Sequence, residues 1–170
     1  MRKRVIGALL GGVIVCAWGV LSWMALPWHS RAMRSLDHDV DVVRMLDFGT
    51  PASGIYLYPQ AASREMKAGL PMAFVSFSKE GARPVVQAVL LGLCLQIAGA
   101  FILTWLISKT SGLAYGQKVL FAAAYGLAAG LLGAGPNWIW MNFAPDYTLL
   151  GIADSLISWT LAGLAIGKVL

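Results

Sequence analysis

"VVQAVLLGLCLQIAGAFILTWLI", residues 85–107, is an apolar stretch without a single charged side chain. A helix rises 1.5 Å per residue, so about 20 apolar residues are enough to cross the roughly 30 Å hydrocarbon core of a bilayer. The stretch is also much longer than an ordinary buried strand. It therefore predicts a membrane-spanning helix.

The composition of the whole chain agrees with this prediction. Hydrophobic residues make up 58% and charged residues 12%, with a mean hydropathy of +0.70, whereas soluble domains average about 25% charged residues. Three further apolar runs are long enough to span a membrane, at residues 5–26, 118–140 and 147–169. We predict a single integral membrane domain, residues 1–170, that is all-α and forms a bundle of four transmembrane helices.

The first and third apolar runs each contain a feature that could change how the span forms. The first run follows "MRKR", as a secretory signal does, but it is too long for a signal and no A-x-A cleavage site follows. We expect it to be retained as a helix. The third run is expected to be interrupted near Pro136, because proline lacks the backbone N–H that a helix interior uses.

Basic residues indicate the orientation, since short cytoplasmic segments are enriched in lysine and arginine. With four spans, six basic residues fall on one side of the membrane: Arg2, Lys3, Arg4, Lys109, Lys118 and Lys168. We predict a bacterial inner-membrane protein with both termini cytoplasmic and residues 28–84 extracytoplasmic. The net charge of +5 then reflects topology and lipid contact, and no nucleic-acid surface is expected.

The extracytoplasmic segment has a pattern of its own. Apolar residues recur at three- and four-residue spacing over residues 30–46, which predicts an amphipathic helix. "FGTPASG" ends it with turn residues. "IYLYP" and "PMAFVSF" follow as two short strand-like runs joined by a polar linker, and they could pair as a β-hairpin. A small cap over the bundle is the expected result.

Glycines indicate how the helices pack, because membrane helices approach closely where small residues share a face. "GALLG", "GLAAG" and "GLAIG" each place two glycines four residues apart, and another pair lies seven residues apart in the second span. The predicted packing residues are Gly7, Gly11, Gly92, Gly99, Gly126, Gly130, Gly163 and Gly167. These faces could meet within the chain or bind another protein.

Asp154 is the one acidic residue well inside a predicted span. It lies seven residues into the fourth run, about 10 Å deep, and an ionisable side chain at such depth is a functional hypothesis by default. Gln96 and Asn142 are candidate partners for a proton or cation path. The alternative is that the helix begins nearer Gly151 and that Asp154 is a shallow residue favoured by the helix dipole.

The stretch "SWMALPWHSRAMRSLDHD", residues 22–39, contains both histidines of the chain. Met24, His29, Met33 and His38 offer thioether and imidazole groups, which suit copper, so a metal site at the membrane edge is one hypothesis. The other interpretation of His29 is a polar tip at the headgroup boundary. Otherwise no cofactor is predicted. The sequence contains no H-E-x-x-H, P-loop or dinucleotide motif and no serine-hydrolase pattern, which argues against an enzyme.

"LSWMALPWH", "SGIYLYP" and "PMAFVSF", in that order ahead of three further spans, resemble a group of small bacterial inner-membrane proteins of unknown function. The resemblance covers nearly the whole chain and implies no activity. In size and number of spans the chain is also similar to the small membrane subunit of tripartite substrate transporters, which lacks so long an ordered segment between its first two helices.

The sequence leaves three functional hypotheses. The first is a non-catalytic accessory or assembly subunit, with the lipid bilayer, other membrane subunits or further copies of itself as partners. The second is a small transporter or ligand-handling protein that uses Asp154 and Gln96. The third is copper handling at the outer interface.

Overall fold

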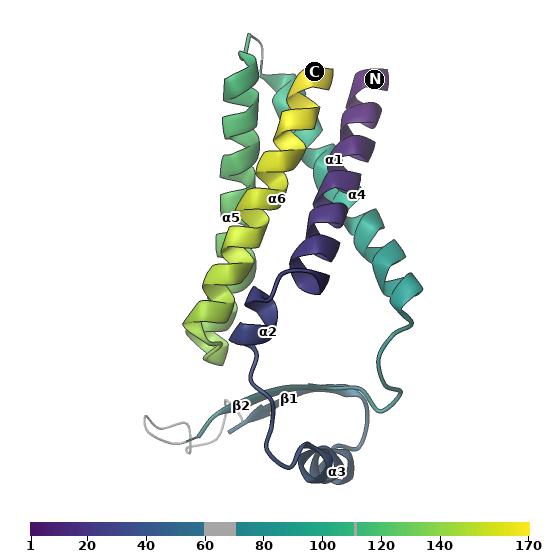
Figure 1. Cartoon of the computed structure of the whole chain (residues 1–170), viewed down its shortest axis with the longest axis vertical. Coiled ribbons are helices and arrows are strands. Elements are labelled where there is room, and N and C mark those ends of the chain that lie inside the picture. Colours follow the sequence, from purple (N-terminus) through teal and green to yellow (C-terminus); the bar gives the residue numbers. More distant parts are fainter. Residues whose placement is uncertain (60–70, 111) are drawn as a thin grey trace.

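A computed structural model describes residues 1–59, 71–110 and 112–170. Helices dominate it, and a two-stranded sheet lies at one end (Figure 1). The elements in chain order are α1 Arg2–Met24, α2 Trp28–Ala32, α3 Asp39–Gly49, β1 Gly54–Tyr58, β2 Ala73–Phe77, α4 Val85–Lys109, α5 Tyr115–Met141 and α6 Pro145–Val169.

Within the described residues, α1, α4, α5 and α6 are long and apolar enough to cross a membrane. They contain 23 to 27 residues each, so by helical rise each is at least about 35 Å long. Their positions agree with the four predicted spans, and their ends lie a few residues outside most of the predicted limits. We call these four helices the helical part.

The expected interruption near Pro136 is wrong, because α5 continues through Pro136 to Met141. Proline removes one backbone hydrogen bond, and here it does so five residues before the helix ends. The long run of bonds before it keeps the helix intact. The helix ends at Asn142, which adopts the left-handed conformation with φ 53°.

Helix α6 lies centrally in the helical part and packs against both α5 and α1, while α1 also packs against α4. Figure 1 shows α6 between α5 and α1, with α4 crossing behind them. The buried core lies where α1, α4 and α6 meet, around Ala100, Leu103 and Ile166, and extends to Ala122 of α5.

Helix α4 is packed along only one half of its length. Its buried residues all lie between Ala100 and Ile107. The half that begins at Val85 has no buried residue: residues 85–91 are all exposed, and this end of α4 diverges from the other helices toward the sheet (Figure 1). The α4 half that follows β2 therefore adds little to the core.

The single amphipathic helix predicted over residues 30–46 is wrong, because the structure has two helices, α2 and α3. The chain leaves helical geometry at Met33 and re-enters it after His38, which has a φ of 54°. Helix α2 packs on α6, whereas α3 lies beside the sheet, where Lys79 Nζ lies 2.9 Å from Asp47 Oδ1. One straight helix could not make both sets of contacts.

The predicted β-hairpin is confirmed as an antiparallel pair. Strand β1 pairs with β2 in the register Gly54↔Phe77, Tyr56↔Val75 and Tyr58↔Ala73. The polar linker expected between the strands falls on residues 60–70, outside the described residues. We call α3, β1 and β2 the cap, and Figure 1 shows it at the end of the helical part opposite both chain termini.

Candidate functional site

Asp154 lies deeper in its helix than the shallow alternative allows. Helix α6 begins at Pro145, so nine residues precede Asp154 in the helix, a rise of about 13 Å. The alternative, a helix beginning nearer Gly151, is therefore wrong. Asp146, in the first turn, is the acidic residue that occupies the dipole-favoured position.

The Asp154 carboxylate accepts hydrogen bonds from α1 and α2. Trp18 Nε1 donates to Oδ1 at 3.1 Å, and the Ser22 hydroxyl lies 2.7 and 2.8 Å from Oδ1 and Oδ2. His29 Nε2 lies 2.7 Å from Oδ2. An ionised carboxylate only accepts, so the His29 tautomer that fits an ionised Asp154 is the one with its hydrogen on Nε2.

A turn after α1 places His29 against Ser22. Helix α1 ends at Met24, Pro27 is the N-cap of α2, and α2 folds back so that His29 Nε2 comes within 3.0 Å of Ser22 Oγ. Trp28 Nε1 donates to the same hydroxyl at 3.0 Å. Hydrogen bonds linked in this way polarise and strengthen one another in a dry environment.

The His29 side chain is buried, so it is not the exposed polar tip that one interpretation expected. His29 is 3% exposed and Ser22 is fully buried. The Trp23 ring stacks on the imidazole, with ring centroids 4.0 Å apart and planes 10° apart, and Trp28 meets it edge-on. Asp154 compensates for the cost of burying Nε2 of this imidazole.

Serine, histidine and aspartate meet here, but not as a hydrolase triad. In that triad the carboxylate binds one ring nitrogen and the serine the other. Here both Ser22 and Asp154 lie at Nε2, and His29 Nδ1 is buried with no hydrogen-bond partner among the described residues. The fully buried Ser22 hydroxyl is also out of a substrate's reach, so the group is arranged to hold the carboxylate.

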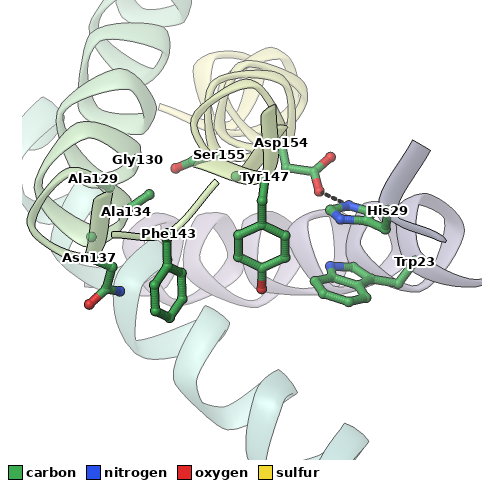
Figure 2. Close-up of a pocket in the computed structure, with 12 residues that line it drawn as sticks. Trp23, His29, Ala129, Gly130, Ala134, Asn137, Phe143, Tyr147, Asp154 and Ser155 are labelled. Atoms are coloured by element: carbon green, nitrogen blue, oxygen red, sulfur yellow. Dashed lines mark hydrogen bonds and ion pairs between the residues drawn. The ribbon is translucent and has the colours of Figure 1, made fainter. Parts of the chain in front are cut away.

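Two cavities adjoin the Asp154 carboxylate. The larger, about 390 Å³, lies between α5, α6 and the α1–α2 turn, as Figure 2 shows. The smaller, about 210 Å³, lies on the side of α1 and α4. Trp23, Asp154 and Ser155 line both. The larger cavity is further lined by His29, Ala129, Gly130, Gly133, Ala134, Asn137, Phe143, Tyr147 and Gly151.

The two predicted partners of Asp154 lie in different places. Gln96 lines the smaller cavity together with Asp154. Asn142 caps the end of α5, and its Nδ2 lies 3.1 Å from Met72 Sδ. Its neighbour Phe143 lines the larger cavity instead.

The four residues of the copper hypothesis lie in contrasting environments. His29 is buried against Asp154, whereas the side chains of Met24 and Met33 are 79% and 48% exposed and His38 is exposed at the start of α3. Across residues 1–59, 71–110 and 112–170, no three His, Cys, Asp or Glu side chains come together in a group that could hold a metal ion.

Most of the glycines named from the sequence lie at helix contacts. A Cβ on Gly126 would fall 2.6 Å from Trp159 Cβ, and one on Gly163 would fall 2.5 Å from Ala122 Cβ. Neighbours within 4 Å also surround the Cβ positions of Gly7, Gly11, Gly99, Gly130 and Gly167. A Cβ added at Gly92 would meet no described atom within 4 Å apart from those of its own helix.

Sequence reasoning missed Trp18 and Ser22, the two residues of α1 that bind Asp154. A signal for them existed: they lie four residues apart and so share one helix face, and both carry a hydrogen-bond donor inside an apolar run. What the sequence could not indicate is that this face of α1 is turned toward Asp154.

Comparison of the chain with protein-family models, with curated proteins and with solved structures finds no match.

Proposed function

We propose that this protein is a small transporter or ligand-handling protein of the bacterial inner membrane, in which Asp154 receives a small polar ligand. In this proposal the helical part is a transmembrane four-helix bundle and the cap is extracytoplasmic. We propose no catalytic role for the protein. The observation that carries the proposal is the Asp154 carboxylate, held by three donors at the junction of two cavities.

The distribution of basic residues supports the orientation. The start of α1, the end of α4 and the start of α5 carry Arg2, Lys109 and Lys118, and α6 ends with Lys168. Both chain termini lie at the end of the helical part away from the cap (Figure 1). The positive-inside rule then favours cytoplasmic termini and an outer location for residues 28–84.

The surroundings of Asp154 support a ligand-binding role. Three protein donors offset the cost of keeping the carboxylate inside the helical part, yet its side chain is still 16% exposed. A purely structural carboxylate would gain nothing from remaining accessible to two cavities. Gln96, in the smaller cavity, supplies a second polar group deeper along α4, which favours passage of the ligand beyond Asp154.

Cysteine accessibility tests whether the larger cavity opens to the outer side. In a background with Cys16 and Cys94 replaced by alanine, Ala134→Cys places a thiol in the cavity, and Leu132→Cys, 77% exposed on the same helix, is the matched lipid-facing control. A membrane-impermeant methanethiosulfonate reacts with thiolates in water. Added to spheroplasts, it should modify position 134 and leave position 132 unmodified.

Gly19→Cys extends the test to the smaller cavity, where a side chain at Gly19 would meet no described atom within 4 Å. Slower but complete modification at position 19 is the expected sign of passage beyond Asp154. If position 134 is unreactive from the outer side, the proposed ligand-handling function is wrong.

A second candidate function, an accessory subunit of a larger membrane complex, is favoured by the unpacked half of α4. Val85, Val86 and Leu95 are each about 70% exposed there, which leaves an apolar helix surface for another membrane protein. Leu95→Trp should then remove a stoichiometric partner from the protein purified in mild detergent, and Leu132→Trp should retain it. Purification without any partner would exclude this candidate, and metal analysis of the same sample tests the copper hypothesis.

A further inference from the structure

We infer that the ligand of the larger cavity is an organic monocation, such as a substituted ammonium ion. This inference rests on the proposed ligand-handling function and names the class of ligand. It combines three observations on the cavity lining: the sign of its accessible charge, its aromatic rings and its shortage of metal ligands.

The accessible charge in the cavity is negative. Asp154 and His29 are the only ionisable lining residues apart from the Tyr147 phenol, and no Lys or Arg belongs to the lining among the described residues. The Asp154 side chain is 16% exposed and that of His29 is 4% exposed, so an entering ligand meets the carboxylate first. Trp18, Ser22 and His29 supply one hydrogen each, and a carboxylate has about four acceptor sites. One site therefore remains for the ligand.

Aromatic rings form the part of the cavity wall next to Asp154. Figure 2 shows Tyr147 between Phe143 and Trp23, with the Asp154 carboxylate to one side of Tyr147, where it points toward His29. The Phe143 and Tyr147 rings lie 6.0 Å apart at 58° to each other. The faces of such rings attract cations and also accept methyl or methylene groups. Carboxylate and rings together favour a cation that carries hydrocarbon.

The size and composition of the cavity argue against a bare metal ion. Hard cations need about six oxygen ligands, whereas this lining offers one carboxylate, the Asn137 amide, and the Ser155 and Tyr147 hydroxyls. A volume of about 390 Å³ is far larger than a metal ion requires. Gly133 adds no side chain to the lining from α5, and a Cβ there would meet nothing within 4 Å among the described residues, which leaves room for an organic body.

The test uses choline and its neutral carbon isostere 3,3-dimethylbutanol, with tetraethylammonium as a larger cation. Each is titrated into the purified full-length protein in nanodiscs, and tryptophan fluorescence is recorded because Trp23 lines the cavity. We expect saturable binding of at least one cation and at least about tenfold weaker binding of the neutral isostere, a difference of about 1.4 kcal/mol.

Two kinds of variant locate the binding site. Asp154→Asn should abolish the preference for the cation, whereas Asp146→Asn, an exposed acid in the first turn of the same helix, should bind as the wild type does. If Asp154→Asn does not fold, Tyr147→Leu provides the test, because Tyr147 lies outside the buried network. It should weaken cation binding by about three- to tenfold.

The outcomes separate this inference from the proposed function. The cation inference alone would be overturned if choline and 3,3-dimethylbutanol bind equally well. It would also be overturned if no cation binds although the Ala134→Cys variant is modified from outside. Cation binding that Asp154→Asn and Tyr147→Leu both leave unchanged would overturn it too. An unreactive Ala134→Cys would remove the proposed function itself.

Discussion

The half of the helical part beside the chain termini and the half beside the cap are held together by different interactions. Near the termini, glycines bring helices into direct contact. The polar side chains there bind backbone carbonyls: Thr104 binds one of its own helix, and Tyr115 and Tyr125 bind carbonyls of α6 and α4. Near the cap, α1, α2 and α6 are joined through the Asp154 carboxylate, with cavities on both sides of it. One half is close-packed and the other is polar and hollow.

This difference indicates which half of the helical part can bind a ligand. Close packing gives stability and leaves no room for a ligand. A buried polar network gives less net stability for the same volume, because desolvation offsets much of its attraction. A small chain therefore gains its stability in one half and can retain a charged, accessible group in the other.

The largest expected effect comes from breaking the close-packed contact between α1 and α4. A Cβ on Gly12 would lie 2.6 Å from Ile97 Cα and 2.7 Å from Ile97 N, and backbone atoms cannot move aside. Gly12→Leu should lower the free energy of unfolding by about 3 kcal/mol, measured by denaturant unfolding in mild detergent.

Gly92→Leu on α4 is the matched control, because its Cβ would meet no described atom within 4 Å. Its stability should stay within about 0.5 kcal/mol of the wild type. Equal losses in the two variants would mean that the half near the termini does not depend on close helix contact.

A smaller effect is expected from the polar half. Ser22→Ala removes the hydroxyl that donates to Asp154 and accepts from Trp28 Nε1. A hydrogen bond to a charged group contributes about 1.5–3 kcal/mol, so a loss of about 2 kcal/mol is expected by the same unfolding measurement.

Ser158→Ala is the control for this change. Ser158 is also buried, at 5% exposure, but its hydroxyl donates only to the Ser155 carbonyl of its own helix. It should lose less than about 1 kcal/mol. A Ser22→Ala loss no greater than that of Ser158→Ala would mean that the network does not join the helices.

The smallest effect is a pH dependence in the cap. The Ser53 hydroxyl donates to Glu80, and this hydrogen bond is the main reason why the pKa of Glu80 is lowered from its ordinary value of 4.5. A lowered folded-state pKa stabilises the fold above pH 4.5, and the contribution is lost as the pH falls through the lowered value. Amide-exchange protection at Lys79, whose N–H donates to Ser53 Oγ, should decrease over that interval after correction for intrinsic exchange.

Ser53→Ala and Glu80→Gln should both lack this pH dependence and leave the helical part unchanged. If the Glu80→Gln variant keeps the full pH dependence of amide exchange, a group other than Glu80 is responsible for it. Because Glu80 is exposed to solvent, the effect on overall stability is expected to be the smallest of the three.

Some helices and strands could be predicted from the sequence more accurately than others. The four long helices and the hairpin followed from runs of apolar and β-branched residues, because these patterns depend only on neighbours along the chain. The interruption at Pro136 and the single helix over residues 30–46 were wrong for one reason: a local signal was outweighed by its surroundings. A long helix tolerated the proline, and contacts with α6 and with the sheet separated α2 from α3.

The candidate site was predictable only in part. Asp154 was identified because a charge inside an apolar run is costly wherever it lies. The burial of His29 was not foreseen, since its position at the end of a predicted span gave no sign that α2 folds back. Gly12 was overlooked and Gly92 named, because residue spacing defines a helix face without saying which residues on that face meet a neighbour.

The sequence by itself determined that four helices are long and apolar enough to cross a membrane, that a hairpin lies between the first two, and that the last apolar run carries one carboxylate, Asp154. Only the tertiary structure decided what that carboxylate meets. Trp18, Ser22 and His29 come from segments more than a hundred residues away along the chain, and helix rotation and the turn at Pro27 bring them to Asp154. Contacts of this kind depend on how helices pack, which no local pattern of residues specifies.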